Sequence, residues 1–282
     1  MNLLEAILLG IIQGLSEFLP ISSTGHLTLF GKLFNLISNQ RPEEWTAFIA
    51  VIQLGTLIAV IIYFRNDIRK IILDFINENL KQRVKFSEQK LNSKLGWLII
   101  IGSIPVGIIG KSLEKVIEGT LTKNLYVIAC SLIGLAIILA IAEKTAQLKK
   151  EMKDITRWNA FWIGVAQCCA LIPGSSRSGT TITGGLFLGL NRETAARFSF
   201  LLSIPAVLAS GLLELYEARK FLNPGMTLYM VTATIFAFIF GYLSIDFLLK
   251  YLKRNTTFVF IYYRIALGIV ILVLLSIHII QP

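Results

Sequence analysis

Two related stretches decide the fold of this 282-residue chain, Pro20-Ile21-Ser22-Ser23-Thr24-Gly25-His26 and Pro173-Gly174-Ser175-Ser176-Arg177-Ser178-Gly179. Each is a polar island inside a long apolar run, and we call them the first island (residues 20–26) and the second island (residues 173–179). Hydroxyl, imidazole and guanidinium groups are costly to place in hydrocarbon. The sequence therefore predicts that the islands meet inside the protein and bind a polar ligand, with the rest of the chain as their scaffold.

The composition of the chain is that of a membrane protein. Hydrophobic residues make up 55% of it and charged residues 16%, and the mean hydropathy is +0.70, which excludes an ordinary soluble protein. The first apolar run contains Glu5 and lacks a basic start, so we expect no cleaved signal peptide. The cysteines lack metal-ligand spacing, and we expect Cys130, Cys168 and Cys169 to pack as small apolar side chains.

Six segments are apolar and long enough to cross a bilayer. They span about residues 45–64, 95–110, 124–143, 198–216, 226–248 and 257–280. The loops on one side, at 65–94, 144–157, 191–197 and 250–254, carry eight, five, two and three Lys or Arg. The opposite side carries only Lys32, Arg41, Lys111, Lys115, Lys123, Arg219 and Lys220.

This asymmetry of charge predicts the orientation of the chain. Basic loops remain in the cytoplasm, so the first set of loops is predicted to be cytoplasmic and both termini to lie outside. Because the topology accounts for the net charge of +10, we expect no nucleic-acid partner. The aromatic residues Trp45, Trp97, Trp158, Tyr262 and Tyr263 fit an interfacial belt.

Two further apolar regions, residues 3–33 and 159–190, are broken near the middle by a proline and a serine pair. Each fits two helices joined by a break, and the charge pattern requires each to return to the side from which it came. A broken backbone at membrane depth is tolerated only where protein or a polar cavity covers it. We therefore predict two re-entrant helix–break–helix hairpins, the first entering from outside and the second from the cytoplasm.

The order of elements repeats along the chain, with one hairpin followed by three spans in each half. Gly10-Ile11-Ile12-Gln13 matches Gly164-Val165-Ala166-Gln167, and a Pro-x-Ser-Ser island follows each. The predicted fold is an all-α polytopic membrane protein, with six transmembrane helices and two re-entrant hairpins arranged as an inverted repeat around a midplane site. Chance similarity of two Gly/Ser-rich hairpins is the alternative. Residues 1–282 form one predicted domain, with pseudo-repeats at about 1–143 and 158–282 and a basic cytoplasmic linker at about 144–157.

The chemistry of the islands points to an anion. Serine at a helix start caps free backbone N–H groups, and the helix dipole presents positive potential there. Two such N-termini facing each other make a phosphate-sized receptor, to which Arg177 adds a fixed cationic fork. The alternatives for Arg177 are that it neutralises a structural carboxylate or extends to the membrane surface.

The first hairpin adds groups that suit phosphoryl transfer. Gln13 and Glu17 share a helix face, as do Ser23 and His26 on the next helix. Glu17, helped by Gln13, can hold a hard divalent cation; His26 can move a proton or attack phosphorus; Ser23 can bind phosphate or be the nucleophile. The alternative for His26 is a capping or packing role, and His278 is expected to lie at the interface without a chemical role.

Two other kinds of phosphate site do not fit. The second island has the glycine spacing of a P-loop, but Thr180 stands where the lysine belongs and no buried strand precedes it. The Ser-Thr-Gly-His run of the first island is also found in lipid phosphatases of the acid-phosphatase type. Those need a second histidine with an acidic partner, and His278 is the only other histidine.

The residues from Gln13 to His26 and from Pro173 to Thr181 closely resemble the two signature motifs of the undecaprenyl-diphosphate phosphatase family of the bacitracin-resistance type. The similarity covers nearly the whole chain, including Gln53-Leu54-Gly55 and Phe198-Ser199-Phe200-Leu201-Leu202. The family's first motif begins with Glu or Gln. Gln13 fits that pattern but brings one fewer charge for binding a metal.

The resemblance implies a phosphoric anhydride hydrolase of the bacterial inner (plasma) membrane. Its substrate would be undecaprenyl diphosphate, and its products undecaprenyl phosphate and inorganic phosphate, which recycles the cell-wall lipid carrier and confers bacitracin resistance. The implied cofactor is a divalent cation, Mg²⁺ or Ca²⁺, at Glu17 and Gln13. The catalytic set is Glu17, Ser23, His26 and Arg177, and the phosphate contacts are Ser22, Thr24, Ser175, Ser176, Ser178 and Thr181.

Other functions share this scaffold. Inverted repeats with paired hairpins are typical of transporters, so a lipid-phosphate or anion carrier or flippase is the main alternative. A protein that sequesters polyprenyl phosphate without chemistry is a third reading. The predicted partners are a polyprenyl diphosphate lipid and the bilayer, and the sequence leaves a homodimer open.

Overall fold

The computed structural model covers the whole chain, and it describes residues 1–37, 42–112, 124–219 and 224–281. Within those ranges the regular structure is helical, apart from one isolated bridge between Lys150 and Leu190. Four basic residues of the predicted outer face, Arg41, Lys115, Lys123 and Lys220, lie outside the described residues.

The helices follow the predicted order. In the first half they are α1 (Leu3–Phe18), α2 (Ser23–Leu33), α3 (Pro42–Tyr63), α4 (Arg65–Ile76), α5 (Leu91–Ser112) and α7 (Leu125–Thr145). In the second half they are α8 (Arg157–Cys168), α9 (Arg177–Phe187), α10 (Arg192–Ala218), α11 (Pro224–Leu252) and α12 (Phe258–Ser276). Short helical turns cover Asn77–Lys81, Phe86–Glu88, Met152–Asp154 and Cys169–Leu171.

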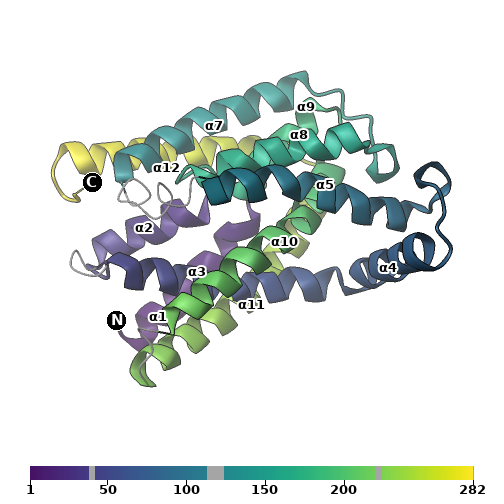
Figure 1. Cartoon of the computed structure of the whole chain (residues 1–282). Coiled ribbons are helices and arrows are strands. Elements are labelled where there is room, and N and C mark those ends of the chain that lie inside the picture. The colour runs from purple at the N-terminus through teal and green to yellow at the C-terminus, as the bar shows by residue number, and fades with distance from the viewer. Residues whose placement is uncertain (38–41, 113–123, 220–223, 282) are drawn as a thin grey trace.

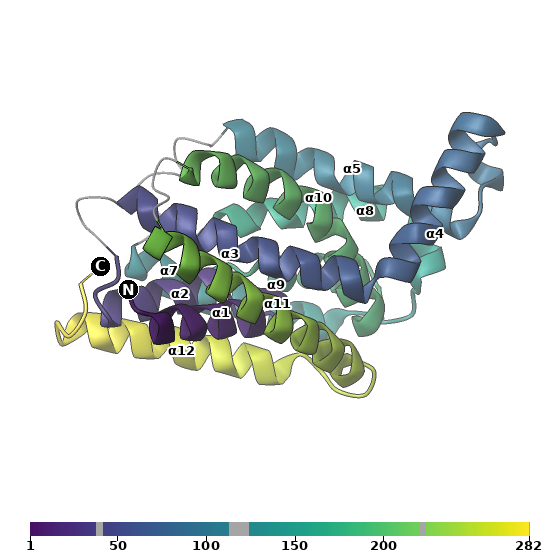
Figure 2. The same ribbon diagram turned by 90° about the horizontal axis from the view of Figure 1, so that it is seen from below.

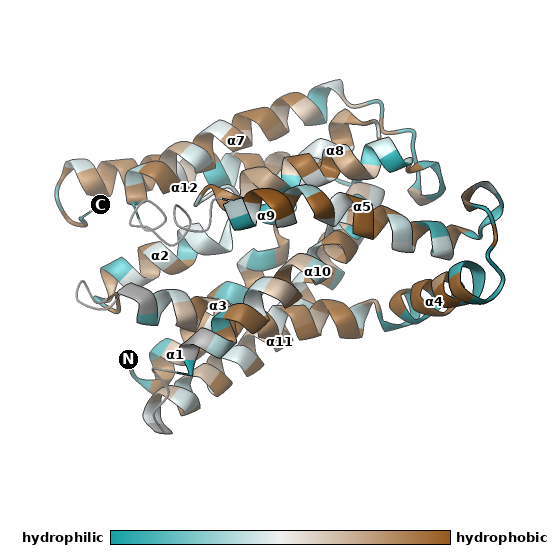
Figure 3. Ribbon diagram, in the orientation of Figure 1, coloured by the Kyte–Doolittle hydropathy of each residue, from teal (hydrophilic) through white to brown (hydrophobic). Residues whose placement is uncertain are grey.

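The six predicted membrane spans are confirmed as α3, α5, α7, α10, α11 and α12, each long and apolar enough to cross a bilayer. Figure 3 shows apolar residues along these helices and polar residues gathered toward their ends. Residues 191–197 are not a loop as predicted, because α10 already begins at Arg192. Its start is fixed by Asn191, whose side chain accepts a hydrogen bond from the backbone N–H of Thr194 at 2.8 Å.

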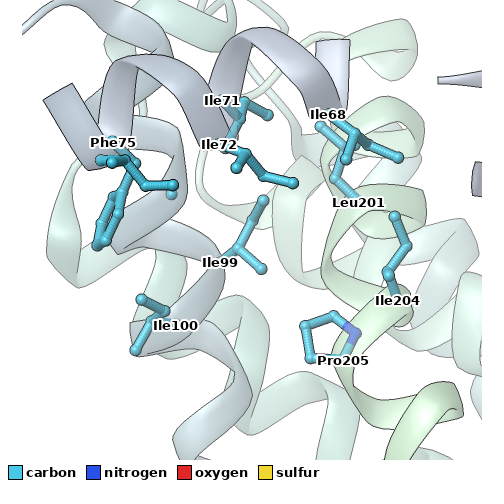
Figure 4. Close-up of a pocket in the computed structure, with 11 residues that line it drawn as sticks. Ile68, Ile71, Ile72, Phe75, Ile99, Ile100, Leu201, Ile204 and Pro205 are labelled. Atoms are coloured by element: carbon cyan, nitrogen blue, oxygen red, sulfur yellow. The ribbon is translucent and has the colours of Figure 1, made fainter. Parts of the chain in front are cut away.

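Helix α4 lies inside the region that the charge pattern marked only as a basic loop. Its apolar residues recur at helical spacing and face α5 and α10 around a small cavity of about 250 Å³ (Figure 4). Ile68, Ile71, Ile72 and Phe75 supply the α4 side of that cavity. The lining is almost entirely apolar, so we assign this region to packing.

The two hairpins pack in matching ways on opposite halves of the chain. Helix α1 packs against α11, where a side chain at Gly10 would strike the backbone of Ala233. Helix α8 packs against α5, where a side chain at Gly164 would strike the backbone of Gly102. Helix α3 contacts α10, and α7 contacts α12. These pairings are consistent with the inverted repeat, which stays a prediction, as does the re-entrant path of the hairpins through a bilayer.

The arrangement of the ends agrees with the topology expected from charge. Both termini lie at one end of the bundle, whereas α4 and the linker before α8 lie at the other (Figure 1). Seen from below, α12 and α5 run along opposite edges, with the hairpin helices between them (Figure 2). Tertiary contacts thus bring the two breaks toward the middle of the bundle.

A buried polar cluster ties three helices together at the α4 end. Glu143 of α7 accepts hydrogen bonds from Arg192 Nε at 2.6 Å and from Thr257 Oγ1 at 2.8 Å. The carboxylate is almost fully buried, so its charge depends on these partners. The cysteines are free, and Cys168 is half-buried, whereas Cys130 and Cys169 are exposed, so the prediction that they pack as small apolar side chains is not met within the protein for those two.

Candidate functional site

Each island ends a break and starts a short helix with the same unusual cap. Ser22 precedes α2 with φ of 77°, and Ser176 precedes α9 with φ of 68°. The Ser22 hydroxyl accepts a hydrogen bond from the Gly25 N–H at 3.1 Å, and that of Ser176 accepts one from the Gly179 N–H at 3.2 Å. Positive φ at a residue other than glycine costs of order 1–3 kcal/mol and persists where the surroundings enforce it. The two serine caps are therefore equivalent, and the surrounding structure holds each of them in this conformation.

The positions of the two caps show which residues of the islands correspond, and they differ by one residue from the alignment of the Pro-x-Ser-Ser patterns. Ser22 follows Gln13 by nine residues, and Ser176 follows Gln167 by nine. The structural counterpart of Ser22 is therefore Ser176, and not Ser175 as the shared Pro-x-Ser-Ser pattern predicted. The proline is displaced by one position because it shapes only the break, whereas the cap sets the helix start. Ser23 and Arg177 are consequently equivalent first residues of α2 and α9.

Glu17 is the point at which the two islands meet. Its Oε2 accepts hydrogen bonds from Gln13 Nε2 at 3.0 Å and from Ser23 Oγ at 2.7 Å, and its Oε1 forms an ion pair with Arg177 Nη2. Arg177 therefore neutralises a carboxylate, which was one of the alternatives, but that carboxylate belongs to the predicted site. The guanidinium does not extend to the surface.

A large cavity of about 950 Å³ lies beside this carboxylate. Residues of both islands line it: Ser22, Ser23, Thr24, Ser175, Ser176 and Arg177, together with Glu17. Apolar side chains of α3, α5 and α10 line it as well, including Ile49, Val106, Ala206, Ala209 and Leu213. Lys111, Glu214, Gln53 and Gln167 are further polar lining residues. The cavity thus combines polar and charged groups, among them the Glu17–Arg177 pair, with hydrocarbon walls, which suits a lipid with a small anionic head group.

His26 points to a different neighbour. Its Nδ1 lies 2.6 Å from the Ser22 carbonyl oxygen, which can only accept, so Nδ1 carries the proton. Its Nε2 lies 2.7 Å from the Tyr263 hydroxyl, and the two rings are stacked. His26 is not among the described residues that line the cavity. In this structure its contacts are those of the packing alternative.

Two predicted phosphate contacts, Ser178 and Thr181, point away from the cavity. The Ser178 hydroxyl donates to the Leu19 carbonyl oxygen at 3.1 Å, which joins the second island to the residue just before the first. The Thr181 hydroxyl is fully buried, bonds the Arg177 carbonyl oxygen at 2.8 Å and pairs with Ser199. Neither Ser178 nor Thr181 is among the described lining residues of the cavity, so both support the site from its rear.

Arg264 is the residue that the sequence reasoning missed most clearly. It is fully buried in α12, and its Nη2 donates to the Ser175 carbonyl oxygen at 2.9 Å. No carboxylate pairs with it in the described ranges of the chain. An arginine inside the last apolar span should have drawn attention, because such a residue is expensive in a membrane and usually functional. Its neighbour Tyr263, expected only in an interfacial belt, holds His26.

The oxygen atoms around Glu17 could ligate a hard cation only if a bound phosphate ligand and water supplied the remaining ligands. Gln13 Oε1 is buried and lacks a hydrogen-bond partner, and it lies on the residue that bonds Glu17. Carboxylate and amide oxygens are the donors that Mg²⁺ and Ca²⁺ prefer. No group of three His, Cys, Asp or Glu that could hold a metal occurs among the described residues. The remaining ligands would have to be phosphate oxygens and water, which is the usual mode for Mg²⁺.

The fold and the site together define a class: polytopic helical membrane proteins with a buried carboxylate–arginine pair beside a lipid-sized cavity. Within that class, the chain belongs to the family described as bacitracin resistance protein BacA, whose sequence model matches residues 6–270.

Named relatives cover almost the whole chain. A protein of Syntrophobacter fumaroxidans named undecaprenyl-diphosphatase is 55% identical over 95% of this chain and 95% of its own length. Undecaprenyl-diphosphatases of Chlorobaculum tepidum, 48% identical over 98% of both chains, and of Myxococcus xanthus, 47% identical over 98% of this chain and 90% of its own length, are also similar.

Proposed function

We propose that this protein is an undecaprenyl-diphosphatase, which removes the terminal phosphate from the lipid carrier undecaprenyl diphosphate. The observation that carries the proposal is the Glu17–Arg177 pair, joined by Ser23, in a cavity with apolar walls. The names of relatives that match along nearly the whole chain support it. The family name fits a role in bacitracin resistance.

The diphosphate would bind between the two islands. Arg177 can leave Glu17 and present its planar fork to phosphoryl oxygens, which accept two parallel hydrogen bonds from it. The N-termini of α2 and α9 add free N–H groups and positive dipole ends. The isoprenoid chain would follow the apolar wall formed by α3, α5 and α10.

Ser23 is the nucleophile that the geometry favours. Its hydroxyl already donates to Glu17, whereas His26 faces Tyr263. In the first step Ser23 Oγ forms a bond to the terminal phosphorus, the bridging P–O bond breaks, and Glu17 transfers the serine proton to the departing lipid monophosphate. In the second step water attacks the phosphoserine, and Glu17 transfers the water proton to Ser23 Oγ as inorganic phosphate leaves.

A divalent cation, Mg²⁺ or Ca²⁺, completes the proposal. Glu17 and the unpartnered Gln13 Oε1 are the protein atoms that would hold it, with the diphosphate and water as further ligands. Bound there, it would offset the negative charge that develops on the phosphoryl oxygens. Attack by His26 or directly by water remains a competing route for the same site.

The cellular setting follows from the proposed substrate. We place the protein in the bacterial inner (plasma) membrane, with the basic end in the cytoplasm and access to the cavity from the outer side. The sequence leaves a homodimer open, and the mass of the detergent-solubilised protein measured by light scattering tests it.

The decisive experiment is phosphate release from undecaprenyl diphosphate by the purified protein in detergent, with and without Mg²⁺. We expect metal-dependent release that Glu17→Ala and Arg177→Ala strongly reduce. Absence of release from the wild-type protein would overturn the proposal.

The second candidate is a lipid-phosphate or anion transporter, favoured by the matching contacts of the two halves. Liposomes containing the protein discriminate between the two. Movement of lipid phosphate across the bilayer without phosphate release supports the transporter. If neither activity is observed, a protein that only binds the lipid is the reading that stands.

A further inference from the structure

Gln167 is a polar side chain of the cavity that the proposed mechanism does not use, and among the described lining residues its amide is the one with both atoms buried and unpartnered. It lies in α8 and is fully buried. Both atoms of its carboxamide lack a hydrogen-bond partner, although the residue lines the same cavity as Glu17 and Arg177. Buried amide groups in proteins are almost always paired, because an unmade hydrogen bond is expensive. The partner of this carboxamide is therefore expected to come from whatever fills the cavity.

The first half of the chain shows what such a carboxamide binds. Gln13 is the counterpart of Gln167, since each precedes its serine cap by nine residues. Gln13 Nε2 donates to Glu17, which follows it by four residues. The residue four positions after Gln167 is Leu171, which also lines the cavity. In the second half the protein thus keeps the donor and omits the anionic acceptor.

The cavity supplies the electrostatic setting for an anionic acceptor from outside. Arg177 and the N-terminus of α9 present positive charge to the same space. A phosphoryl oxygen is a strong acceptor that these groups attract. We propose that Gln167 is a binding residue for the phosphoryl head group, donating from Nε2 to a phosphate oxygen of the ligand. The assignment deepens the proposed function, because it rests on a phosphate ligand in this cavity.

The test compares Gln167→Met, which removes the amide at similar volume, with the wild-type protein. We expect KM for undecaprenyl diphosphate to rise about ten-fold or more, with kcat changed much less. We expect the Tm of the unliganded variant to equal or exceed that of the wild type, because no protein hydrogen bond is lost. Inorganic phosphate and farnesyl diphosphate should each raise the Tm of Gln167→Met less than they raise that of the wild type. If the rise is smaller with both probes, Gln167 binds the phosphate. If it is smaller with farnesyl diphosphate alone, Gln167 binds the diphosphate of a lipid.

Matched variants make the result unambiguous. Gln82→Met removes an exposed amide that does not line the cavity, and it should leave KM and the ligand-induced rise in Tm unchanged. Gln167→Glu places a carboxylate against the phosphate and should weaken binding more than Gln167→Met does. If Gln167→Met fails to fold, Gln167→Asn, which withdraws the same amide by one methylene, carries the same expectation for KM.

Unchanged KM together with an unchanged ligand-induced rise in Tm overturns the assignment, whatever happens to the Tm of the unliganded protein. The proposed function fails separately, if the wild-type protein releases no phosphate. Even then, the Tm measurement with inorganic phosphate still decides whether Gln167 binds a phosphoryl group.

Discussion

Ser23 and Arg177 occupy the same position in the two halves of the chain, and both donate to the carboxylate of Glu17. Each is the first residue of a short helix behind a serine cap with positive φ. One repeated backbone feature thus delivers a hydroxyl from one side and a guanidinium from the other. This pair is one difference in chemistry between the halves, and the replacement of Glu17 by Leu171 in the second half is another.

Replacing Arg177 should weaken binding of the phosphate. Because Arg177→Ala deletes the fixed cation that pairs with the buried Glu17 carboxylate, we expect kcat/KM for phosphate release to fall by about 10²–10³-fold. Arg177→Lys keeps the charge but loses the fork and should recover only part of the activity. Near-normal turnover by purified Arg177→Ala would show that Arg177 only neutralises Glu17.

Trapping the intermediate should identify the nucleophile. Substrate labelled in the terminal phosphate, quenched in acid during turnover, should leave label on the wild-type protein and none on Ser23→Ala. His26→Ala should still become labelled, because His26 is held by Tyr263 away from the cavity. Label lost from His26→Ala but kept by Ser23→Ala would reverse the assignment, and an unlabelled wild type would favour direct attack by water.

Two glycines in equivalent positions offer a matched comparison of the caps. A Cβ at Gly179 would lie 2.8 Å from the Arg264 guanidinium, whereas at Gly25 the nearest atom would be 3.3 Å away. We expect Gly179→Ala to displace Arg264 or the Ser176 cap and to lower kcat/KM about ten-fold or more. Gly25→Ala should change it only a few-fold. Equal effects of the two substitutions would argue against a role for the Arg264 contact.

Removing the divalent cation should stop phosphate release. We expect exhaustive chelation to abolish activity and added Mg²⁺ to restore it, with Glu17→Gln requiring a much higher concentration of Mg²⁺ because the amide is a weaker ligand than the carboxylate. Activity as a function of free Mg²⁺ measures this. Full activity in chelator would rule out the proposed cation.

The buried cluster at Glu143 should contribute to stability but not to chemistry. Glu143→Ala leaves the Arg192 side chain without its carboxylate partner, so we expect the free energy of unfolding to fall by roughly 3 kcal/mol and Tm by several degrees. Lys250→Met breaks only an exposed pair with Asp246 and should change stability by less than about 1 kcal/mol. A shift in Tm no larger for Glu143→Ala than for Lys250→Met would contradict this role.

Much of the architecture could be predicted because hydrocarbon allows few solutions. Long apolar segments must span the bilayer as helices, and the charge of their loops orients them. Six spans were predicted, and six helices of the described chain fit them. Helix α4 escaped prediction because charged residues share its sequence with the apolar face that packs on α5 and α10.

The sequence predicted which residues belong to the site better than it predicted how they are arranged. The sequence patterns predicted that Glu17, Ser23 and Arg177 belong to one site. They did not predict the Glu17–Arg177 ion pair, because it depends on how the two hairpins pack against each other. The register of the islands is set by the backbone caps at Ser22 and Ser176. The match of Gln13 with Gln167 agrees with it, whereas the Pro-x-Ser-Ser pattern is shifted by one residue. Contacts between distant segments, such as Arg264 with Ser175, follow only from tertiary packing.

If Arg177 binds the phosphate as proposed, the Glu17–Arg177 pair would also make the site selective. An incoming anion must compete with a carboxylate that belongs to the same molecule and is therefore present at high effective concentration. The phosphodiesters of ordinary phospholipids carry a single negative charge and compete poorly, whereas a terminal diphosphate carries more charge and several acceptors. On the proposed function, Glu17 would thus compete for Arg177 and keep the abundant lipids of the membrane from occupying it.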